Sequence, residues 1–511
     1  MSDESIALGS ISNGIFVLSK EGKLIYHITQ NSGLSNNTAL SLFEDVDKNL
    51  WIGLDNGINC INLKSPITSY LDNTGILGTT YTSITHNNKL YIGTNQGLFC
   101  KDLNSSSKFE FVQNTKGQVW NLFSYQNTLF CGHDSGTFVV NGTSANLIYN
   151  ASGTWKFVPY SSESNLLLQG NYNGISVLEK KNNSWIFRNK IKGFNYSSKH
   201  FEILNAKEIY VSHEYKGVYR FSVDLQLKNA SNIFRFKNPE KGKNASLAKY
   251  NNQIFYASKA GVFKINNITK AFERDKSLSA MFDNEEYVTG KMIVDKSNKL
   301  WFFTKNYIHY YSSGKLSSEL KKNSLPIPSS LTNSMPGYEN ILQLNEANYL
   351  IGTTDGFYIL KNNDFKFNNY KVSIFGITNN SVNAKSDNVS ISEEGSFDYD
   401  ENNLAFYFAV PEFDKYINAE YQYKLEGLHD NWSDWSFSSQ VFFENLPAGD
   451  YVFSVRAKVA NSITDNVAIY KFEINKPWYA NNLAIIIYII LFIVLGYLSI
   501  FIYYKMFIVF I

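Results

Sequence analysis

One short phrase recurs nine times between residues 6 and 361 of this 511-residue chain. In each copy an apolar stretch meets a small or polar pair, and then a turn residue and a second apolar stretch follow. The copies are Ile6–Leu18, Leu50–Leu63, Leu90–Leu103, Leu129–Gly142, Leu166–Glu179, Ile209–Val223, Ile254–Asn266, Leu300–Tyr311 and Tyr349–Lys361. The turn residues are Gly14, Gly57, Gly97, Gly136, Gly174, Gly217, Gly261 and Gly356, with Tyr307 near the expected place in the eighth copy. A period of about 40 residues is that of the blades of a β-propeller.

Each copy has the pattern of a β-hairpin. The glycine supplies a backbone conformation with positive φ, which a tight hairpin needs and other residues adopt only at a steric cost. A strand before the hairpin, such as Leu40–Glu44 or Lys291–Asp295, and one after it, such as Ile67–Leu71 or Phe365–Asn369, would complete four strands per blade. The sequence therefore predicts an all-β chain in which residues 1–368 form about eight full blades and one partial blade.

The period stops after the last copy, and residues 369–476 show a different pattern. Six short strands with turn signals between them predict an immunoglobulin-like β-sandwich. The expected strands are Val372–Ile377, Leu404–Val410, Tyr421–Leu425, Val441–Phe443, Tyr451–Lys458 and Ile469–Ile474. Trp432 and Trp435 are expected to anchor the core or the rim of this domain.

The C-terminal segment Leu483–Tyr503 carries no charge and is long enough to cross a bilayer as a helix. Trp478 and Tyr479 precede it, where a membrane interface favours aromatic side chains. We expect a transmembrane helix over residues 483–504 and a short tail over residues 505–511. A buried helix of a soluble core is the alternative.

Several of these segments resemble known families. The repeats containing LWIGLDNGIN and LYIGTNQGLF resemble the two-component-regulator propeller repeat. The block Tyr421–Phe437 (YQYKLEGLHDNWSDWSF), with NLPAGDYVFSVRA and KPWY after it, resembles the three-tyrosine (Y_Y_Y) sensor domain. Tyr421, Tyr423 and Tyr451 match its tyrosines. A propeller, this sandwich and a membrane helix in that order resemble the extracytoplasmic half of Bacteroidetes-type membrane sensors.

The resemblance implies a periplasmic, glycan-responsive sensor in the inner membrane that regulates transcription, with an oligosaccharide ligand and a homodimer formed through the sandwich and helix. A kinase or a DNA-binding output domain would follow the helix in that family, and this chain shows neither. Met1–Ala7 has no basic n-region and no apolar h-region, so no signal peptide is visible. The sequence therefore predicts the sensor portion of a longer regulator, without its output domain.

The residues that could carry chemistry favour structural roles. The three cysteines, Cys60, Cys100 and Cys131, are expected to be small buried hydrophobes, because no CxxC pair occurs. The seven histidines show no metal-ligand spacing. These are His27, His86, His133, His200, His213, His309 and His429. No metal, cofactor or catalytic residue is predicted, and the ligand-binding residues stay unassigned at this stage.

Charge and carboxylate patterns bear on the remaining classes of function. Asp45, Asp47 and Asp295 lie in turns just before a tryptophan strand, faintly like the structural Asp-box of sialidases, so a propeller glycoside hydrolase is an unfavoured alternative. The chain has 47 basic and 45 acidic residues, which argues against nucleic-acid binding. The pairs Lys180–Lys181, Lys190 with Lys192, and Lys241 with Lys243 are expected in solvated loops. A membrane-anchored scaffold that binds protein through a propeller face is the other alternative.

Overall fold

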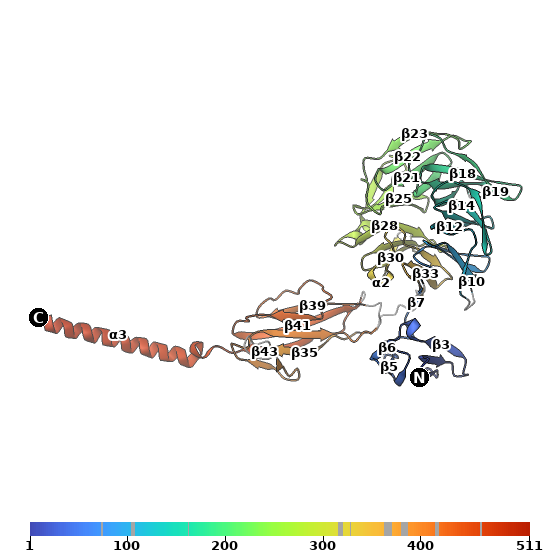
Figure 1. The fold of residues 1–511 in the computed structure, drawn as a ribbon. Coiled ribbons are helices and arrows are strands. Elements are labelled where there is room, and N and C mark those ends of the chain that lie inside the picture. The colour runs from blue at the N-terminus through green and yellow to red at the C-terminus, as the bar shows by residue number, and fades with distance from the viewer. Residues whose placement is uncertain are drawn as a thin grey trace. The chain divides into compact units, whose positions relative to one another are not determined.

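The chain divides into two compact units, Met1–Lys366 and Phe367–Ile511, which are described in turn. Figure 1 shows the elements of both in the computed structural model. The structure describes residues 1–72, 75–103, 108–161, 163–314, 320–327, 329–361, 370–379, 387–413, 418–459 and 462–510.

The first unit begins with two antiparallel three-stranded sheets. They consist of β1 (Ile6–Gly9), β2 (Ile15–Leu18) and β3 (Leu24–Ile28), and of β4 (Ala39–Glu44), β5 (Leu50–Leu54) and β6 (Ile58–Ile61), with the short helix η1 (Gln30–Ser32) between the two sheets. Ile15 and Val17 of one sheet and Leu50 and Ile52 of the other share a small core. Alternating apolar residues therefore bury one face of each sheet against the other.

Seven four-stranded antiparallel sheets follow, and each is one blade of a propeller. The first three blades are β8 (Thr80–His86), β9 (Lys89–Thr94), β10 (Leu98–Asp102) and β11 (Glu110–Phe111); β12 (Val119–Tyr125), β13 (Thr128–His133), β14 (Gly136–Asn141) and β15 (Ser144–Tyr149); and β16 (Thr154–Pro159), β17 (Leu166–Asn171), β18 (Gly174–Lys181) and β19 (Ser184–Lys190). The next three are β20 (His200–Asn205), β21 (Glu208–His213), β22 (Gly217–Val223) and β23 (Ala230–Arg235); β24 (Ser246–Tyr250), β25 (Gln253–Ser258), β26 (Gly261–Ile265) and β27 (Phe272–Asp275); and β28 (Tyr287–Val294), β29 (Leu300–Thr304), β30 (Ile308–Ser313) and β31 (Leu320–Leu325). The short helices α1 (Lys276–Ser279), η2 (Ala280–Phe282) and α2 (Ser329–Thr332) lie in connections around the sixth blade.

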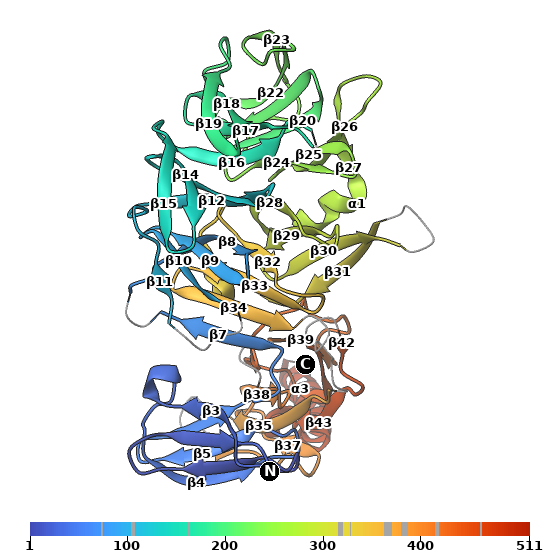
Figure 2. The same ribbon diagram turned by 90° about the vertical axis from the view of Figure 1, so that its right-hand side faces the viewer.

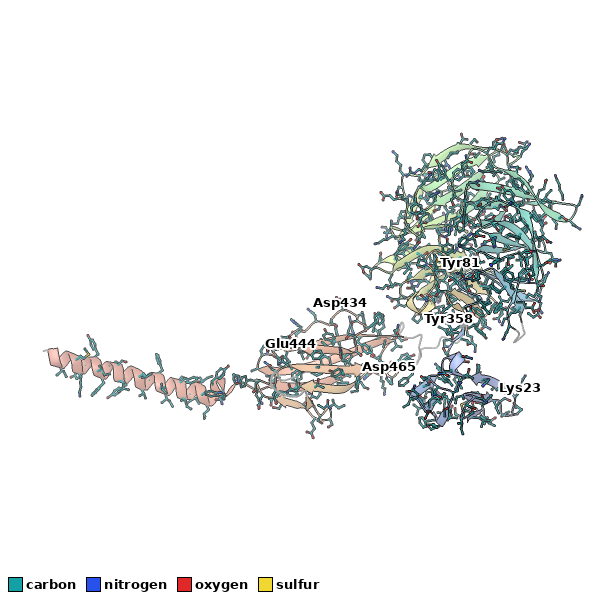
Figure 3. The ribbon with its side chains drawn as sticks, viewed as in Figure 1. Lys23, Tyr81, Tyr358, Asp434, Glu444 and Asp465 are labelled. Atoms are coloured by element: carbon teal, nitrogen blue, oxygen red, sulfur yellow. The ribbon has the colours of Figure 1, made fainter. Side chains whose placement is uncertain are left out.

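The seventh blade takes its outer strand from the other end of the propeller sequence. Its strands β32 (Ile341–Gln343), β33 (Asn348–Thr353) and β34 (Gly356–Lys361) are completed by β7 (Ile67–Leu71), which pairs with β34. Figure 3 labels Tyr358, whose Cα partner in β7 is Ser69. The first blade also bonds to the seventh directly, because Thr80 Oγ1 donates to the Gly356 carbonyl at 2.9 Å. These bonds close the ring.

The hairpin glycines explain how the blades fold so regularly. All eight turn glycines have positive φ, from 71° at Gly14 to 153° at Gly97. At Gly356 a Cβ would lie 2.1 Å from the Tyr70 carbonyl oxygen, so only glycine lets the closing strand β7 come so close. In the eighth copy the Glu286 carboxylate accepts from the Asn306 backbone N–H at 3.0 Å and supports the turn instead.

The described blades differ from the predicted number of eight full blades and one partial blade. All nine repeat copies form hairpins, but the first two copies make three-stranded sheets and only seven blades have four strands. Ile67–Leu71, expected to complete the second copy, forms β7 in the seventh blade because ring closure needs an outer strand from the opposite end. The strand expected at Phe365–Asn369 lies outside the described residues.

The second unit contains a β-sandwich. One sheet consists of β36 (Asp387–Asn388), β35 (Ser373–Asn379), β38 (Leu404–Ala409) and β40 (Gln440–Phe443), and the other of β37 (Gly395–Phe397), β43 (Ala468–Ile474), β41 (Gly449–Val459) and β39 (Ala419–Glu426), with β42 (Ser462–Ile463) on β41. Phe406 of the first sheet stacks on Phe453 of the second, with ring centroids 4.1 Å apart. Each of the six predicted strands has a counterpart, and the all-β fold class is confirmed.

A short helix, η4 (Trp478–Ala480), leads into the long C-terminal helix α3 (Asn482–Phe510). The most apolar 18-residue window of its segment Asn482–Met506 has a mean hydropathy of 3.0 and is not buried, so the length and composition of the segment suit a bilayer span. Trp478 is 72% exposed just before this helix, where an interfacial aromatic is expected.

Candidate functional site

The innermost strands of the propeller surround a cavity of about 650 Å³. Figure 2 shows the inner strands β8, β12, β16, β24, β28 and β32 towards the middle of the ring and the outer strands towards its edge. The cavity is lined from β8, β12, β16, β24, β28 and β32, and from the start of β20 with the residue before it. Seven blades thus contribute to one space, which is the usual place for a ligand in this architecture.

Three consecutive blades carry the same irregularity at the start of their inner strand. A β-bulge lies between Thr80 and Thr82, between Val119 and Asn121, and between Thr154 and Lys156. The extra residues are Tyr81, Trp120 and Trp155, and all three line the cavity. A bulge re-aims the side chain that it leaves out of the ladder. The fold therefore presents three large aromatic side chains from successive blades to the same opening.

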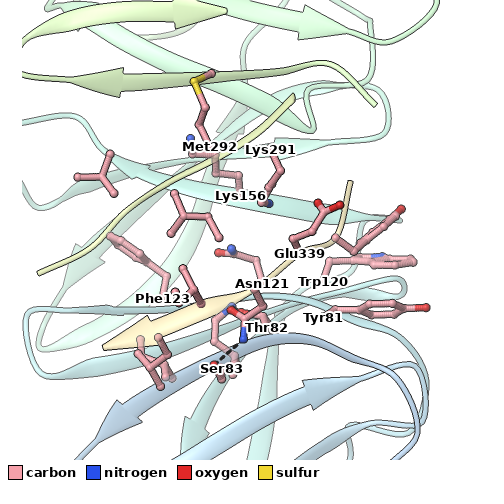
Figure 4. Close-up of a pocket in the computed structure, with 18 of the residues that line it drawn as sticks. Tyr81, Thr82, Ser83, Trp120, Asn121, Phe123, Lys156, Lys291, Met292 and Glu339 are labelled. Carbon is pink, nitrogen blue, oxygen red and sulfur yellow. Dashed lines mark hydrogen bonds between the residues drawn. The ribbon is translucent and has the colours of Figure 1, made fainter. Parts of the chain in front are cut away.

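These aromatic rings form one contiguous cluster. The ring centroids of Tyr81 and Trp120 are 5.3 Å apart, and those of Trp120 and Trp155 are 4.7 Å apart. Tyr338, just before β32, adds a ring 5.0 Å from Tyr81. The buried Nε1 of Trp155 has no hydrogen-bond partner among the described residues. Figure 4 shows the rings of Tyr81 and Trp120 side by side at the edge of the pocket. We call Tyr81, Trp120, Trp155 and Tyr338 the aromatic cluster.

Lysine side chains line the same cavity beside the aromatic cluster. Lys156 on β16 forms an ion pair of 2.6 Å with Glu202. The Lys199 ammonium lies 3.6 Å from the centroid of the Tyr338 ring, a cation–π contact. In the described part of the chain, no hydrogen bond or ion pair holds the side-chain ammonium of Lys199 or of Lys291 on β28. The cavity thus contains two ammonium groups without a direct counter-ion.

Burial brings the pKa values of Lys199, Lys291 and the neighbouring Glu339 close to pH 7. It lowers the pKa of Lys199 to about 7, with a further lowering from Lys291. It also lowers the pKa of Lys291 to about 8, although Glu339 opposes this shift. Burial raises the pKa of Glu339 to about 7, against the effect of hydrogen bonds from the Gly337 N–H at 2.9 and 3.1 Å and of Lys291. Groups titrating together near neutral pH in a cavity are typical of functional sites.

Neutral polar groups complete the lining. Asn340 Nδ2 donates to Ser83 Oγ at 2.6 Å, the bond drawn as a dashed line in Figure 4. Gln343 Nε2 donates to Ser297 Oγ at 2.7 Å, and Asn121 also lines the space. Among the described residues no group of three or more His, Cys, Asp or Glu side chains is placed to hold a metal ion. The site offers aromatic faces, ammonium groups, a carboxyl group and amides.

The aspartates that the sequence suggested for hydrolase chemistry serve turns instead. Asp295 accepts from Trp301 Nε1 at 2.8 Å and from the Ser297 and Lys299 backbone N–H groups. Asp45 accepts from Trp51 Nε1 at 2.8 Å in the same way. The Asp47 side chain is exposed, and its backbone N–H donates to Asp45. The first two carboxylates therefore tie a hairpin to the tryptophan of the next strand.

The cysteines and histidines are spread over the fold. All three cysteines are free; Cys100 and Cys131 are buried in one core cluster, and Cys60 is half-buried. His133 and His309 are buried, whereas His27 and His429 are exposed. His200 is the one histidine of the described cavity lining, and burial holds its pKa well below the usual value.

The lysine pairs predicted in solvated loops lie partly on strands. Lys180 and Lys181 end β18, and Lys190 ends β19. Lys181 is ion-paired with Glu179 at 3.0 Å. Lys241 lines a second, separate cavity of about 540 Å³ at the fourth blade. The loop prediction was wrong for these strand residues because the last two strands of the third blade, β18 and β19, extend beyond their apolar residues.

In the sandwich, the three predicted tyrosines lie on two neighbouring strands of one sheet, Tyr421 and Tyr423 on the end strand β39 and Tyr451 on β41. Tyr421 and Tyr451 are buried, and the Tyr451 hydroxyl donates to the Pro447 carbonyl at 2.7 Å. Tyr423 is half-buried and packs against this core. Trp432 and Trp435 are half-buried and lie 4.4 and 5.6 Å from the Arg456 guanidinium, so they sit at the rim of the domain and not in its core.

Asp295 and His200 were named from the sequence, but neither was assigned to a binding site, and the other residues of the cavity were not singled out. The signal becomes visible when the inner strands of the copies are aligned with one another by the glycine near the end of the strand that follows each of them. Gly93, Gly132 and Gly170 pair with Thr82, Asn121 and Lys156, and the residue before each partner is aromatic in three consecutive copies. That recurrence in sequence was a readable signal. The positions of Lys199, Lys291 and Glu339 around one cavity required the closed ring.

The described residues thus define a class of chain in which a seven-bladed propeller precedes an immunoglobulin-like sandwich and an apolar helix. Residues 412–476 match the model of the Y_Y_Y domain, and residues 33–56 match that of the two component regulator propeller. These matches confirm the resemblance that the sequence motifs indicated. No match is found among curated proteins.

The chain was also compared with solved structures. The extracellular domain of the candidate hybrid two-component system BT3049 from B. thetaiotaomicron superposes with a TM-score of 0.71 at 17% identity, covering 93% of this chain and 67% of the other. The extracellular domain of the candidate one-component system BT4673 from the same organism gives a TM-score of 0.46 at 17% identity, with 93% and 68% covered. The first similarity shows the fold of the chain.

Proposed function

We propose that this chain is the ligand-sensing portion of a membrane-bound signal-transduction regulator, and that the propeller cavity binds an oligosaccharide. The observation that carries the proposal is the aromatic cluster, three of whose members come from bulges at one position of consecutive blades. Flat aromatic faces beside amides suit the apolar faces and hydroxyl groups of a sugar. The Y_Y_Y and regulator-propeller matches support the sensor role.

We place the propeller and sandwich in the periplasm and α3 in the inner membrane. The support is the apolar length of Asn482–Met506 and the extracellular origin of the solved domain that shares this fold. A ligand changes signalling only by binding two states of the sensor with different affinity. In this proposal the chain forms a homodimer through its sandwich and helix, and the dimer transmits the change between the two states across the bilayer. The cavity acts in binding and the chain is not an enzyme in this proposal.

The proposal is tested by calorimetry on the detergent-solubilised full chain with oligosaccharides from digests of diverse polysaccharides. We expect one class to bind without turnover. Trp120→Ala is expected to weaken this binding at least about tenfold, or about 1.4 kcal/mol, because it removes a ring from the cluster. Trp435→Ala, which changes a half-buried tryptophan of the sandwich, is the matched control and should leave affinity unchanged.

Two results would contradict the proposed function. The first is the absence of binding across a broad panel while a protein partner is retained in pull-downs, which would favour a scaffold. The second is turnover of a bound glycan that Glu339→Gln abolishes, which would favour a hydrolase.

A further inference from the structure

We propose that the ligand of the propeller cavity is an anionic oligosaccharide, whose carboxylate or sulfate group lies between Lys199 and Lys291. This inference rests on the proposed function and names the ligand class of the same site. It starts from the imbalance of charge in the cavity. Lys156, Lys199, Lys291 and Lys296 line it, against the carboxyl groups of Glu339 and Asp295.

Three of these six charged groups already have partners. Lys156 is paired with Glu202, which lies next to the cavity. Asp295 is occupied by the indole N–H of Trp301 and two backbone N–H groups, and Lys296 donates to Thr85 Oγ1 at 3.4 Å at the Asp295 end of the lining. Lys199, Lys291 and Glu339 remain. Within the lining, two ammonium groups therefore face one carboxyl group, that of Glu339, which is 4% exposed and accepts hydrogen bonds from Gly337. Outside the lining, the Glu214 carboxylate lies near Lys199 and accepts a hydrogen bond from the Asn244 backbone N–H at 3.3 Å.

The positions of the two free ammonium groups match a charged sugar. Lys199 lies over the ring of Tyr338 and 5.3 Å from the ring centroid of Trp155, so one cation adjoins the aromatic cluster. Lys291 lies within the electrostatic reach of both Lys199 and Lys156, since each pair depresses a pKa. Figure 4 shows Lys156, Lys291 and Glu339 directed into the same space. A ring stacked on the cluster would carry its acidic group towards these lysines.

A cation that is partly buried without a counter-ion lowers the stability of the folded protein. The propeller has two such cations, Lys199 and Lys291, at positions where hydrophobic side chains would pack without this loss of stability. An anion that enters restores the missing pairing, and the attraction is stronger than at an open surface because Lys199 and Lys291 are partly buried. A neutral sugar gains the stacking alone. Uronic acids and sulfated sugars share the required chemistry, so the experiment includes both.

The test compares matched ligand pairs on the full chain by calorimetry. Oligogalacturonate is paired with its methyl ester, and a sulfated oligosaccharide with its desulfated form. We expect one acidic form to bind at least about tenfold more tightly than its neutral partner. Lys291→Met and Lys199→Met should remove that preference and leave neutral-sugar binding within about twofold. Lys23→Met, at an exposed lysine in the turn just before β3 that is labelled in Figure 3, should change neither.

The possible outcomes separate this inference from the proposed function. Equal binding of acidic and neutral partners, with a loss on Trp120→Ala, overturns the anionic inference and leaves the sugar site standing. A preference for acidic ligands that survives both lysine substitutions also overturns it, because the anion then binds elsewhere. Failure of all oligosaccharides overturns the proposed function itself. Thermal midpoints near wild type for both lysine variants show that the loss is not one of folding.

Discussion

Three side chains in the cavity change charge over the same pH range and in the same sense. Glu339 gains a negative charge as pH rises through about 7, while Lys199 and Lys291 lose positive charges through about 7 and about 8. Their charged neighbours are Lys156, paired with Glu202, and Glu214 near Lys199. His200 stays neutral throughout because burial depresses its pKa. The cavity therefore loses net positive charge on going from weakly acidic to weakly basic pH.

We predict that the affinity for an acidic oligosaccharide falls at least about tenfold between about pH 6 and about pH 9. The physical reason is that every titration in the cavity disfavours an anion as pH rises, whereas the ligand itself stays ionised over this range. Calorimetry at several pH values on the full chain measures the effect. Lys291→Met should flatten the profile, and a neutral ligand should show little change. An affinity that rises with pH would contradict the assignment of these lysines.

Among the elements, β7 is the one whose place the sequence misassigned. Its pattern of apolar and polar residues suits an outer blade strand, but nothing local to Ile67–Leu71 says which blade it completes. The closed ring determines the partner, because without β7 the outer edge of β34 would be unpaired. The hairpins, by contrast, follow from glycine and its apolar flanks alone, which is why all nine were predictable.

We predict that Gly356→Ala destabilises the propeller far more than Gly217→Ala. Both glycines have positive φ at the same point of a blade, 138° and 90°. At Gly356 the new Cβ meets the Tyr70 carbonyl at 2.1 Å, whereas at Gly217 the nearest atom lies 3.9 Å away. We expect about 1 kcal/mol for Gly217→Ala and about 3 kcal/mol or more for Gly356→Ala.

The measurement is the midpoint of the propeller's thermal transition, together with hydrogen exchange of the β7 amides. Only Gly356→Ala should speed exchange in β7, because the clash pushes that strand off β34. Equal shifts for the two variants, with β7 still protected, would mean that β7 does not close the ring as described.

For the whole molecule, the order of propeller, sandwich and apolar helix followed from the sequence, but the site did not. Repeats, turn glycines and the uncharged segment Leu483–Tyr503 are local signals that a single pass along the chain can find. The cavity brings Tyr81 on β8 next to Tyr338 before β32, more than 250 residues apart, and only ring closure does so. The candidate site therefore combines a recurrence of aromatic residues that the sequence shows with contacts that no local pattern contains.

Hydrogen exchange of the full chain, with and without a bound acidic oligosaccharide, tests the central claim most directly. The account predicts slower exchange at the cavity ends of the inner strands β8, β12, β16, β28 and β32, with the outer strands β15, β19 and β23 unchanged. Protection confined to the outer strands, with none at the inner strands, would show that the ligand binds elsewhere and would contradict the account.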